Sequence, residues 1–152
     1  MIAGFICAIV AIVADQVTKF LIYGTASRSI IGNFLWFEST LNTGVAFSMF
    51  QGGGLIFIIG SGVFSLLFIY LILSKKFFKS KTEKVSIGFI LGGTLSNMVD
   101  RIIFGGVRDF IYFKFINFAI FNLADTAIVL GAIALCAHVL FQSIKKDNKW
   151  LN

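Results

Sequence analysis

Four apolar runs, each long enough to cross a lipid bilayer, are the feature that most limits how this chain can fold. They cover Ile2–Tyr23, Leu55–Leu73, Val85–Phe104 and Ala119–Phe141. About 20 helical residues span the roughly 30 Å hydrocarbon layer of a membrane. Only 13% of the 152 residues are charged, whereas soluble domains carry about 25%. The sequence therefore predicts a mainly α-helical membrane protein with four transmembrane helices, in which residues 1–152 form a single domain.

The lysines predict how these spans are oriented. Five of them lie between the second and third runs, in residues 74–84, and three more lie in the tail, at Lys145, Lys146 and Lys149. Short basic loops remain in the cytoplasm. Both termini are therefore expected to be cytoplasmic, and segments 24–54 and 105–118 to be extracytoplasmic. The net charge of +6 then reflects topology, so we expect no nucleic-acid partner.

The two outer segments are rich in β-branched and aromatic residues. Residues 30–37 read IIGNFLWF, and residues 107–117 read VRDFIYFKFIN. Such composition with loose alternation is typical of short strands. We expect both stretches to be strands lying at the membrane interface.

Polar residues share helix faces inside the first and third runs. Asp15, Thr18 and Lys19 have i, i+3, i+4 spacing, which places them on one face. Asp15 and Lys19 are interpreted as a structural ion pair with the lysine extending outwards, and direct substrate binding is the alternative. Asp100 is interpreted as the ion-pair partner of its neighbour Arg101, since an unpaired charge at that depth is unstable.

Other residues in these regions carry weaker predictions. Asn97 lies on the same face as Asp100 and Arg101. The pair Gly92-Gly93 favours close approach of a neighbouring helix. Asn42 and Gly44 suit a turn that leaves backbone groups free for a ligand, although an ordinary turn is the simpler interpretation.

Two further carboxylates, Asp109 and Asp125, fall near the outer membrane boundary with Asn122 beside them. Acidic residues at such depth usually serve a function. Two carboxyls held close together cannot both ionise easily, so one keeps a proton while the other acts as a base. This pair could activate water for peptide hydrolysis without a metal or cofactor.

The sequence offers little for other chemistries. It contains no HExxH motif and no Cys or His cluster for zinc, so no metal site is predicted. Cys7 and Cys136 are interpreted as packing residues, and His138 as an interfacial residue. A proton-coupled transporter remains an alternative because intramembrane acids also relay protons. A non-catalytic lipid-binding assembly factor is another.

Five ordered motifs resemble those of bacterial lipoprotein signal peptidases, the signal peptidase II family. They are D-Q-V-T-K at 15–19, N-T-G-V-A-F at 42–47, G-G-T-L-S-N-M-V-D-R at 92–101, G-V-R-D-F at 106–110 and F-N-L-A-D at 121–125. The resemblance covers most of the chain.

This resemblance implies an aspartic endopeptidase of the bacterial cytoplasmic membrane. Its substrate would be a prolipoprotein cut just before a diacylglyceryl-modified cysteine. Apart from the resemblance, we expect a monomer that is in contact with membrane lipid. The resemblance matches Asp109 and Asp125 to the catalytic dyad. It also implies a β-cradle and a short, mobile, lid-like periplasmic helix. Residues matched to substrate-binding or supporting positions are Asn42, Gly44, Asn97, Arg101, Asn122, Ala124, Asp15, Lys19 and Asp100.

Overall fold

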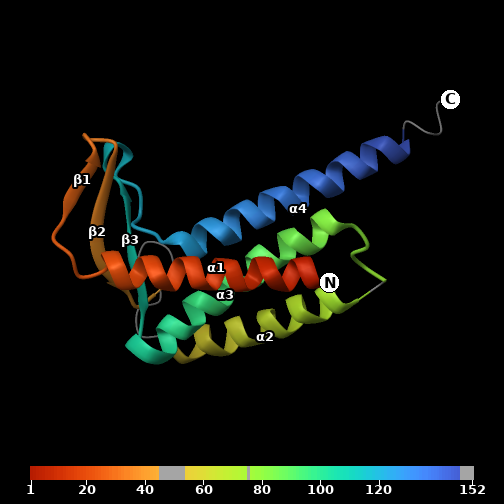
Figure 1. Ribbon diagram of the computed structural model, residues 1–152, viewed down its shortest axis with the longest axis horizontal. Helices are drawn as coiled ribbons and strands as arrows, with labels where there is room; N and C mark the ends of the chain where they lie inside the picture. Colours follow the sequence, from red (N-terminus) through yellow and green to blue (C-terminus); the bar gives the residue numbers. More distant parts are fainter. Residues whose placement is uncertain (45–53, 75, 148–152) are drawn as a thin grey trace.

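Four long helices form a bundle that carries a small antiparallel sheet at one end (Figure 1). The computed structural model describes residues 1–44, 54–74 and 76–147. The elements are α1 (Ile2–Ile22), β1 (Arg28–Ile31), β2 (Leu35–Asn42), α2 (Gly54–Leu73), α3 (Lys81–Phe104), β3 (Val107–Phe113), the 3-10 helix η2 (Lys114–Ile116) and α4 (Leu123–Asp147). All four α-helices are long and apolar enough to cross a membrane. The predicted helical architecture with a small sheet is confirmed.

Helix α3 is the centre of the bundle and packs against α1, α2 and α4. Its glycines allow this close packing. A Cβ atom on Gly92 would lie 2.5 Å from the carbonyl oxygen of Ala8 on α1, and one on Gly93 would collide with the carbonyl oxygen of Ala124 on α4. The close approach predicted for Gly92-Gly93 is therefore confirmed, and the two glycines face different neighbours.

The buried face of α1 changes character along its length. Its buried residues are Gly4, Ala8, Ala11, Asp15 and Lys19. The first three are small, so α1 lies close to α3 there. The last two are charged and lie in the C-terminal half of α1, the half that runs towards the sheet (Figure 1). Among the described residues, α1 thus contributes charge to the interior only at the end of the bundle that carries the sheet.

The sheet has the order β1-β2-β3, with both pairs antiparallel. The stretches 30–37 and 107–117 were expected to be short strands, and this is confirmed in part: a turn at 32–34 divides the first between β1 and β2, and η2 follows β3 in the second. Gly32 adopts a φ of 45° and begins a turn that separates β1 from β2, since glycine tolerates the left-handed region. Between β2 and β3, Thr40 pairs with Asp109 and Asn42 with Val107, beyond an irregularity between Phe37 and Thr40.

Two helices begin four residues away from the predicted start. Helix α3 starts at Lys81 rather than Val85, because Ser80 and Glu83 form a reciprocal capping box. Helix α4 starts at Leu123 rather than Ala119, because Phe121 instead forms a β-bridge with Ile111. The approach to α4 is therefore extended chain tied to β3.

The expected lid-like helix was placed in the outer segment 24–54. Residues 45–53 of that segment lie outside the described residues. Within the described parts of the two outer segments, the one helical turn is η2.

We predict that Gly88→Ala destabilises the bundle, because the added Cβ would collide with the backbone of Gly4 on α1. Overpacking of this kind costs about 1–3 kcal/mol. Gly62→Ala on α2 is the matched control, since nothing lies within 4 Å of its Cβ position. Thermal unfolding in detergent should show a lower midpoint for Gly88→Ala only. Equal midpoints would contradict the close packing of α1 on α3.

Candidate active site

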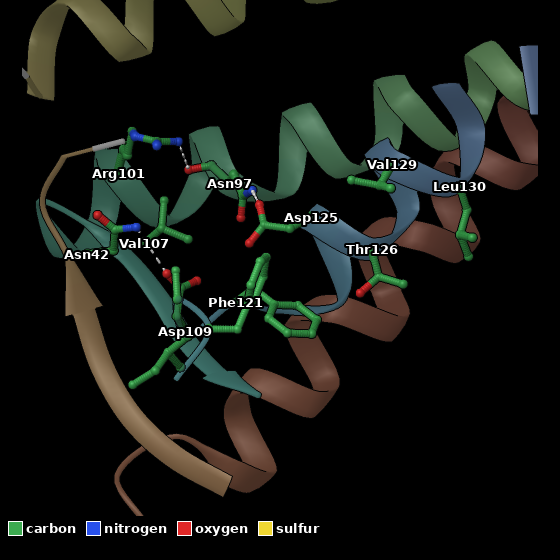
Figure 2. Close-up of a pocket in the computed structure, with 13 residues that line it drawn as sticks. Asn42, Asn97, Arg101, Val107, Asp109, Phe121, Asp125, Thr126, Val129 and Leu130 are labelled. Atoms are coloured by element: carbon green, nitrogen blue, oxygen red, sulfur yellow. Dashed lines mark hydrogen bonds between the residues drawn. The ribbon is translucent and has the colours of Figure 1, made fainter. Parts of the chain in front are cut away.

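Asp109 on β3 and Asp125 on α4 project into one pocket at the sheet end of the bundle (Figure 2). The pocket has a volume of about 540 Å³. Its lining combines these two acids and four other polar or charged residues with a longer apolar wall. The lining residues are Asn42, Asn97, Arg101, Val107, Asp109, Phe118, Ala119, Ile120, Phe121, Asp125, Thr126, Val129 and Leu130.

Asp125 is held by the way in which α4 begins. The side-chain Oδ1 of Asn122 accepts a hydrogen bond from the backbone N–H of Asp125 at 2.9 Å, and the backbone N–H of Asn122 donates to Oδ2 of Asp125 at 3.2 Å. This reciprocal arrangement is a capping box. The first turn of a helix also favours a negative charge. The carboxylate of Asp125 is therefore fixed by local backbone geometry.

Asp109 is held from the side of the sheet. Asn42 lies two residues beyond Thr40, the pairing partner of Asp109, so its side chain shares a face with Asp109. Its Nδ2 donates to Oδ2 of Asp109 at 3.1 Å, while its Oδ1 accepts from the backbone N–H of Gly44 at 3.1 Å. The predicted turn at Asn42 and Gly44 is present, and it orients the amide towards the acid.

Asn122 connects the two acids. Its Nδ2 donates to Oδ1 of Asp109 at 2.6 Å and to Oδ1 of Asn97 at 3.2 Å. Nδ2 of Asn97 in turn donates to Oδ1 of Asp125 at 2.8 Å. Each oxygen of both carboxylates thus accepts at least one hydrogen bond.

Asp109 is the more enclosed of the two acids. Its exposed fraction is 2%, whereas Asp125 is partly exposed. Burial, together with the nearby negative charge of Asp125, raises the pKa of Asp109 to about 7. A carboxyl group with this pKa can hold a proton at neutral pH.

A second set of charges lies behind the pocket, where α1, α3 and β3 meet. Nζ of Lys19 is 2.7 Å from Oδ2 of Asp15 and 3.0 Å from Oδ2 of Asp100. Nη2 of Arg108 is 2.8 Å from Oδ1 of Asp100. We call Asp15, Lys19, Asp100 and Arg108 the buried quartet. It contains two acids and two bases, so its charges cancel.

The structure corrects two predictions about these charges. Asp100 does not pair with Arg101; it binds Arg108 and Lys19, because neighbouring residues on a helix point in different directions. Lys19 does not extend outwards. It is fully buried, and the predicted ion pair with Asp15 is turned into the bundle.

Three contributors to the quartet were not recognised from the sequence. Gln16 donates to Asp100 at 3.0 Å and to the hydroxyl of Ser96 at 2.9 Å. Ser96 donates to Asp15 at 2.6 Å. Arg108 donates to Asp100 through its backbone N–H at 2.9 Å and its side chain. The sequence did hold a signal for them. Gln16 and Ser96 are polar residues within apolar runs that also contain an acid, and Arg108 adjoins Asp109.

The quartet also touches the start of α4. Oδ1 of Asp15 accepts a hydrogen bond from the backbone N–H of Ala124 at 2.9 Å. Ala124 has no exposed surface, and it packs against Gly93. Ala124 therefore lies behind the pocket, as part of the contact between α1, α3 and α4.

Arg101 lies at the junction of two hollows. It lines the pocket described above and a second, apolar hollow of about 330 Å³ between α2, α3 and α4. Its guanidinium stands 5.5 Å from the ring centroid of Phe57 and donates to the carbonyl oxygens of Asn97 and Gly44. Among the described residues that line the pocket, Arg101 is the one cation.

The described residues include no cluster of three or more His, Cys, Asp or Glu side chains that could hold a metal ion. The polar groups that line the pocket are two carboxyl groups, the amides of Asn42 and Asn97, the hydroxyl of Thr126 and the guanidinium of Arg101.

Comparison with known proteins identifies the family from sequence, and a solved structure shares the fold. The family model for signal peptidase II matches residues 7–141. A lipoprotein signal peptidase from Microcystis aeruginosa is 35% identical over 143 residues, covering 86% of this chain and 87% of the relative. One from Enterococcus faecalis is 30% identical over 154 residues, covering 98% and 95%.

A solved structure described as a bacterial membrane enzyme superposes with a TM-score of 0.84 at 28% identity, covering 94% of this chain and 90% of that one. The family model spans most of the chain, and both relatives named above are covered nearly end to end. This chain therefore belongs to the signal peptidase II family of peptidases.

Proposed function

We propose that this protein is an aspartic endopeptidase that removes the signal peptide from lipid-modified prolipoproteins, with Asp109 and Asp125 as its catalytic residues. The observation that supports this most is the convergence of the two carboxyl groups in one pocket (Figure 2). The side chain and backbone of Asn122 link the two groups. The names of the relatives supply the substrate class.

In the proposed reaction, one carboxylate takes a proton from water, and the resulting hydroxide oxygen bonds to the scissile carbonyl carbon. The other carboxyl group gives its proton to the carbonyl oxygen, which yields a neutral tetrahedral diol. In the second step one diol hydroxyl returns a proton to the pair. The C–N bond breaks, and the leaving amine of the lipidated cysteine receives the proton that the first carboxylate took from water. The pair is then left with one proton, as at the start.

The charges of the described residues support a shared proton. The buried quartet is neutral by itself. The pocket then holds two acids and one cation, Arg101. One proton on the pair makes the pocket neutral as well, which lowers the cost of burying it in a membrane protein.

The shape of the pocket suits a substrate anchored by acyl chains. Its apolar wall continues along α4 to Val129 and Leu130, which are both exposed on the outside of the helix. A diacylglyceryl cysteine keeps its acyl chains in the bilayer, so its scissile bond stays near the interface. We propose that Asn42, Asn97, Asn122 and Arg101 position the peptide, and that Gly44 shapes the turn beside it.

We further propose that the pocket faces the extracytoplasmic side of the cytoplasmic membrane. The lysine-rich link after α2 and the C-terminal part of α4 lie at the end of the bundle away from the sheet (Figure 1). Positive charge at that end favours a cytoplasmic location. The protein is proposed to act as a monomer that forms one domain over its whole length.

The central experiment is cleavage of a diacylglyceryl-modified prolipoprotein by the purified protein in lipid, followed by mass spectrometry of the products. We expect a single cut just before the modified cysteine. The unlipidated precursor should be cut far more slowly, because remote binding groups also contribute to the chemical step. Equal rates for the two precursors would contradict recognition by lipid anchoring.

We predict that Asp109→Asn and Asp125→Asn each reduce the cleavage rate by about 10²–10⁴-fold or more, because an amide cannot exchange the catalytic proton. The two acids act as a unit, so the double variant should be scarcely slower than either single variant. Glu38→Gln is the control, since Glu38 is an acid on β2 that does not line the pocket.

The rates are compared per folded molecule, with folding checked by thermal unfolding. Substantial turnover by Asp109→Asn would exclude the proposed dyad.

We also predict that kcat/KM falls as the pH rises through about 7, where Asp109 loses its proton. The direction follows because burial stabilises the protonated acid, and the free enzyme governs kcat/KM. The measured value belongs to the coupled pair of acids. A profile that stays flat between pH 6 and pH 9 would contradict the need for this proton.

A further inference from the structure

The three asparagine side chains that bind the two acids each have their amide oxygen occupied by a donor, which fixes where the amide NH2 group points. In Asn42 the donor is the backbone N–H of Gly44, and in Asn122 it is the backbone N–H of Asp125. Both donors are local. They come from residues two and three positions further along the chain.

Asn97 is the exception, because a charged donor from another helix fixes its amide. Nζ of Lys19 on α1 donates to Oδ1 of Asn97 at 3.1 Å, and Nδ2 of Asn122 adds a second bond to the same atom. If the Asn97 amide flipped, its NH2 group would face the ammonium group, so donor would oppose donor. Nδ2 of Asn97 is therefore held on Oδ1 of Asp125 at 2.8 Å.

Lys19 does not line the pocket. It is fully buried between Asp15 and Asp100, and its ammonium has three contacts, one of which is Asn97. The ion pairs alone would give it a purely structural role. The contact with Asn97 connects the buried quartet to one member of the acid pair.

We propose that Lys19 is a positioning residue for the reaction: by fixing the Asn97 amide, it holds Asp125 as the carboxylate that takes the proton from water. This rests on the proposed function. The two acids differ in the way that these roles require. Asp125 is partly exposed to the pocket and lies in the first turn of α4, where anions are favoured. Asp109 is almost fully enclosed and keeps the shared proton.

The test is a double-mutant cycle with Lys19→Met, Asn97→Leu and both together, measured as kcat and KM on the lipidated substrate per folded molecule. Lys19→Met should lower kcat about ten- to hundredfold with little change in KM, a coupling of ordinary size for contacting residues. In the Asn97→Leu background the same change should lower kcat by less than about threefold, because the amide that Lys19 orients is gone.

Gln16→Leu is the matched control within the same polar cluster. Gln16 bonds to Asp100, Ser96 and Arg108 but makes no bond to Asn97. We expect this variant to be less stable in thermal unfolding, while its kcat per folded molecule stays within about threefold of the unchanged protein.

Lys19→Met leaves two acids with one cation fewer and can fail to fold. The cycle is then repeated in an Asp15→Asn background. There Lys19 and Arg108 face Asp100 alone, so removing Lys19 leaves one acid paired with one cation. If Lys19→Met lowers kcat equally in the unchanged protein and in the Asn97→Leu background, Lys19 does not act through this amide. An unchanged kcat in Lys19→Met would show the same. Either result overturns the inference but not the proposed function, which fails only if Asp109→Asn or Asp125→Asn stays active.

Discussion

The arrangement of this protein depends on the burial of one ammonium group, that of Lys19. Removing a charge from water costs several kcal/mol unless partners of opposite charge surround it. Lys19 has no exposed surface and lies within 3.0 Å of carboxylate oxygens on both Asp15 and Asp100. Because Asp100 also binds Arg108 through its backbone and side chain, the same cluster fixes where β3 starts. Helices α1 and α3 and the sheet are thus joined at the point where the pocket forms.

The two acids of the pocket are held by amide groups rather than by further charged side chains. Asparagine amides donate to both carboxyl groups. These amide bonds favour the carboxylate, whereas burial, the larger effect, raises the pKa of Asp109. One acid of the pair can therefore hold a proton, and among the described lining residues Arg101 supplies the one positive charge.

Much of this architecture was predictable from the sequence, because hydropathy and helical spacing act over short distances. The four helices, the Gly92-Gly93 contact and the Asp15–Lys19 pair follow from such local patterns. The partner of Asp100 was not predictable in this way. Arg101 was the nearest base in sequence, but the actual partner, Arg108, reaches Asp100 only after the chain has turned into β3. The late start of α4 did have a local signal, since Asn122 and Asp125 have the spacing of a capping box, but the apolar residues before it obscured this signal.

The bridge between Phe121 and β3 has a mechanical consequence for an enzyme in a fluid bilayer. The carbonyl oxygen of Phe121 accepts hydrogen bonds from the backbone N–H groups of Phe110 and Ile111. The backbone N–H of Phe121 donates to the carbonyl oxygen of Ile111. These bonds lie between the segment that carries Asp109 and the segment that leads into Asp125. We expect α4 to pivot about this junction when the thickness of the membrane changes its tilt. The spacing of the two carboxyl groups would then be insulated from the lipid composition around the helices.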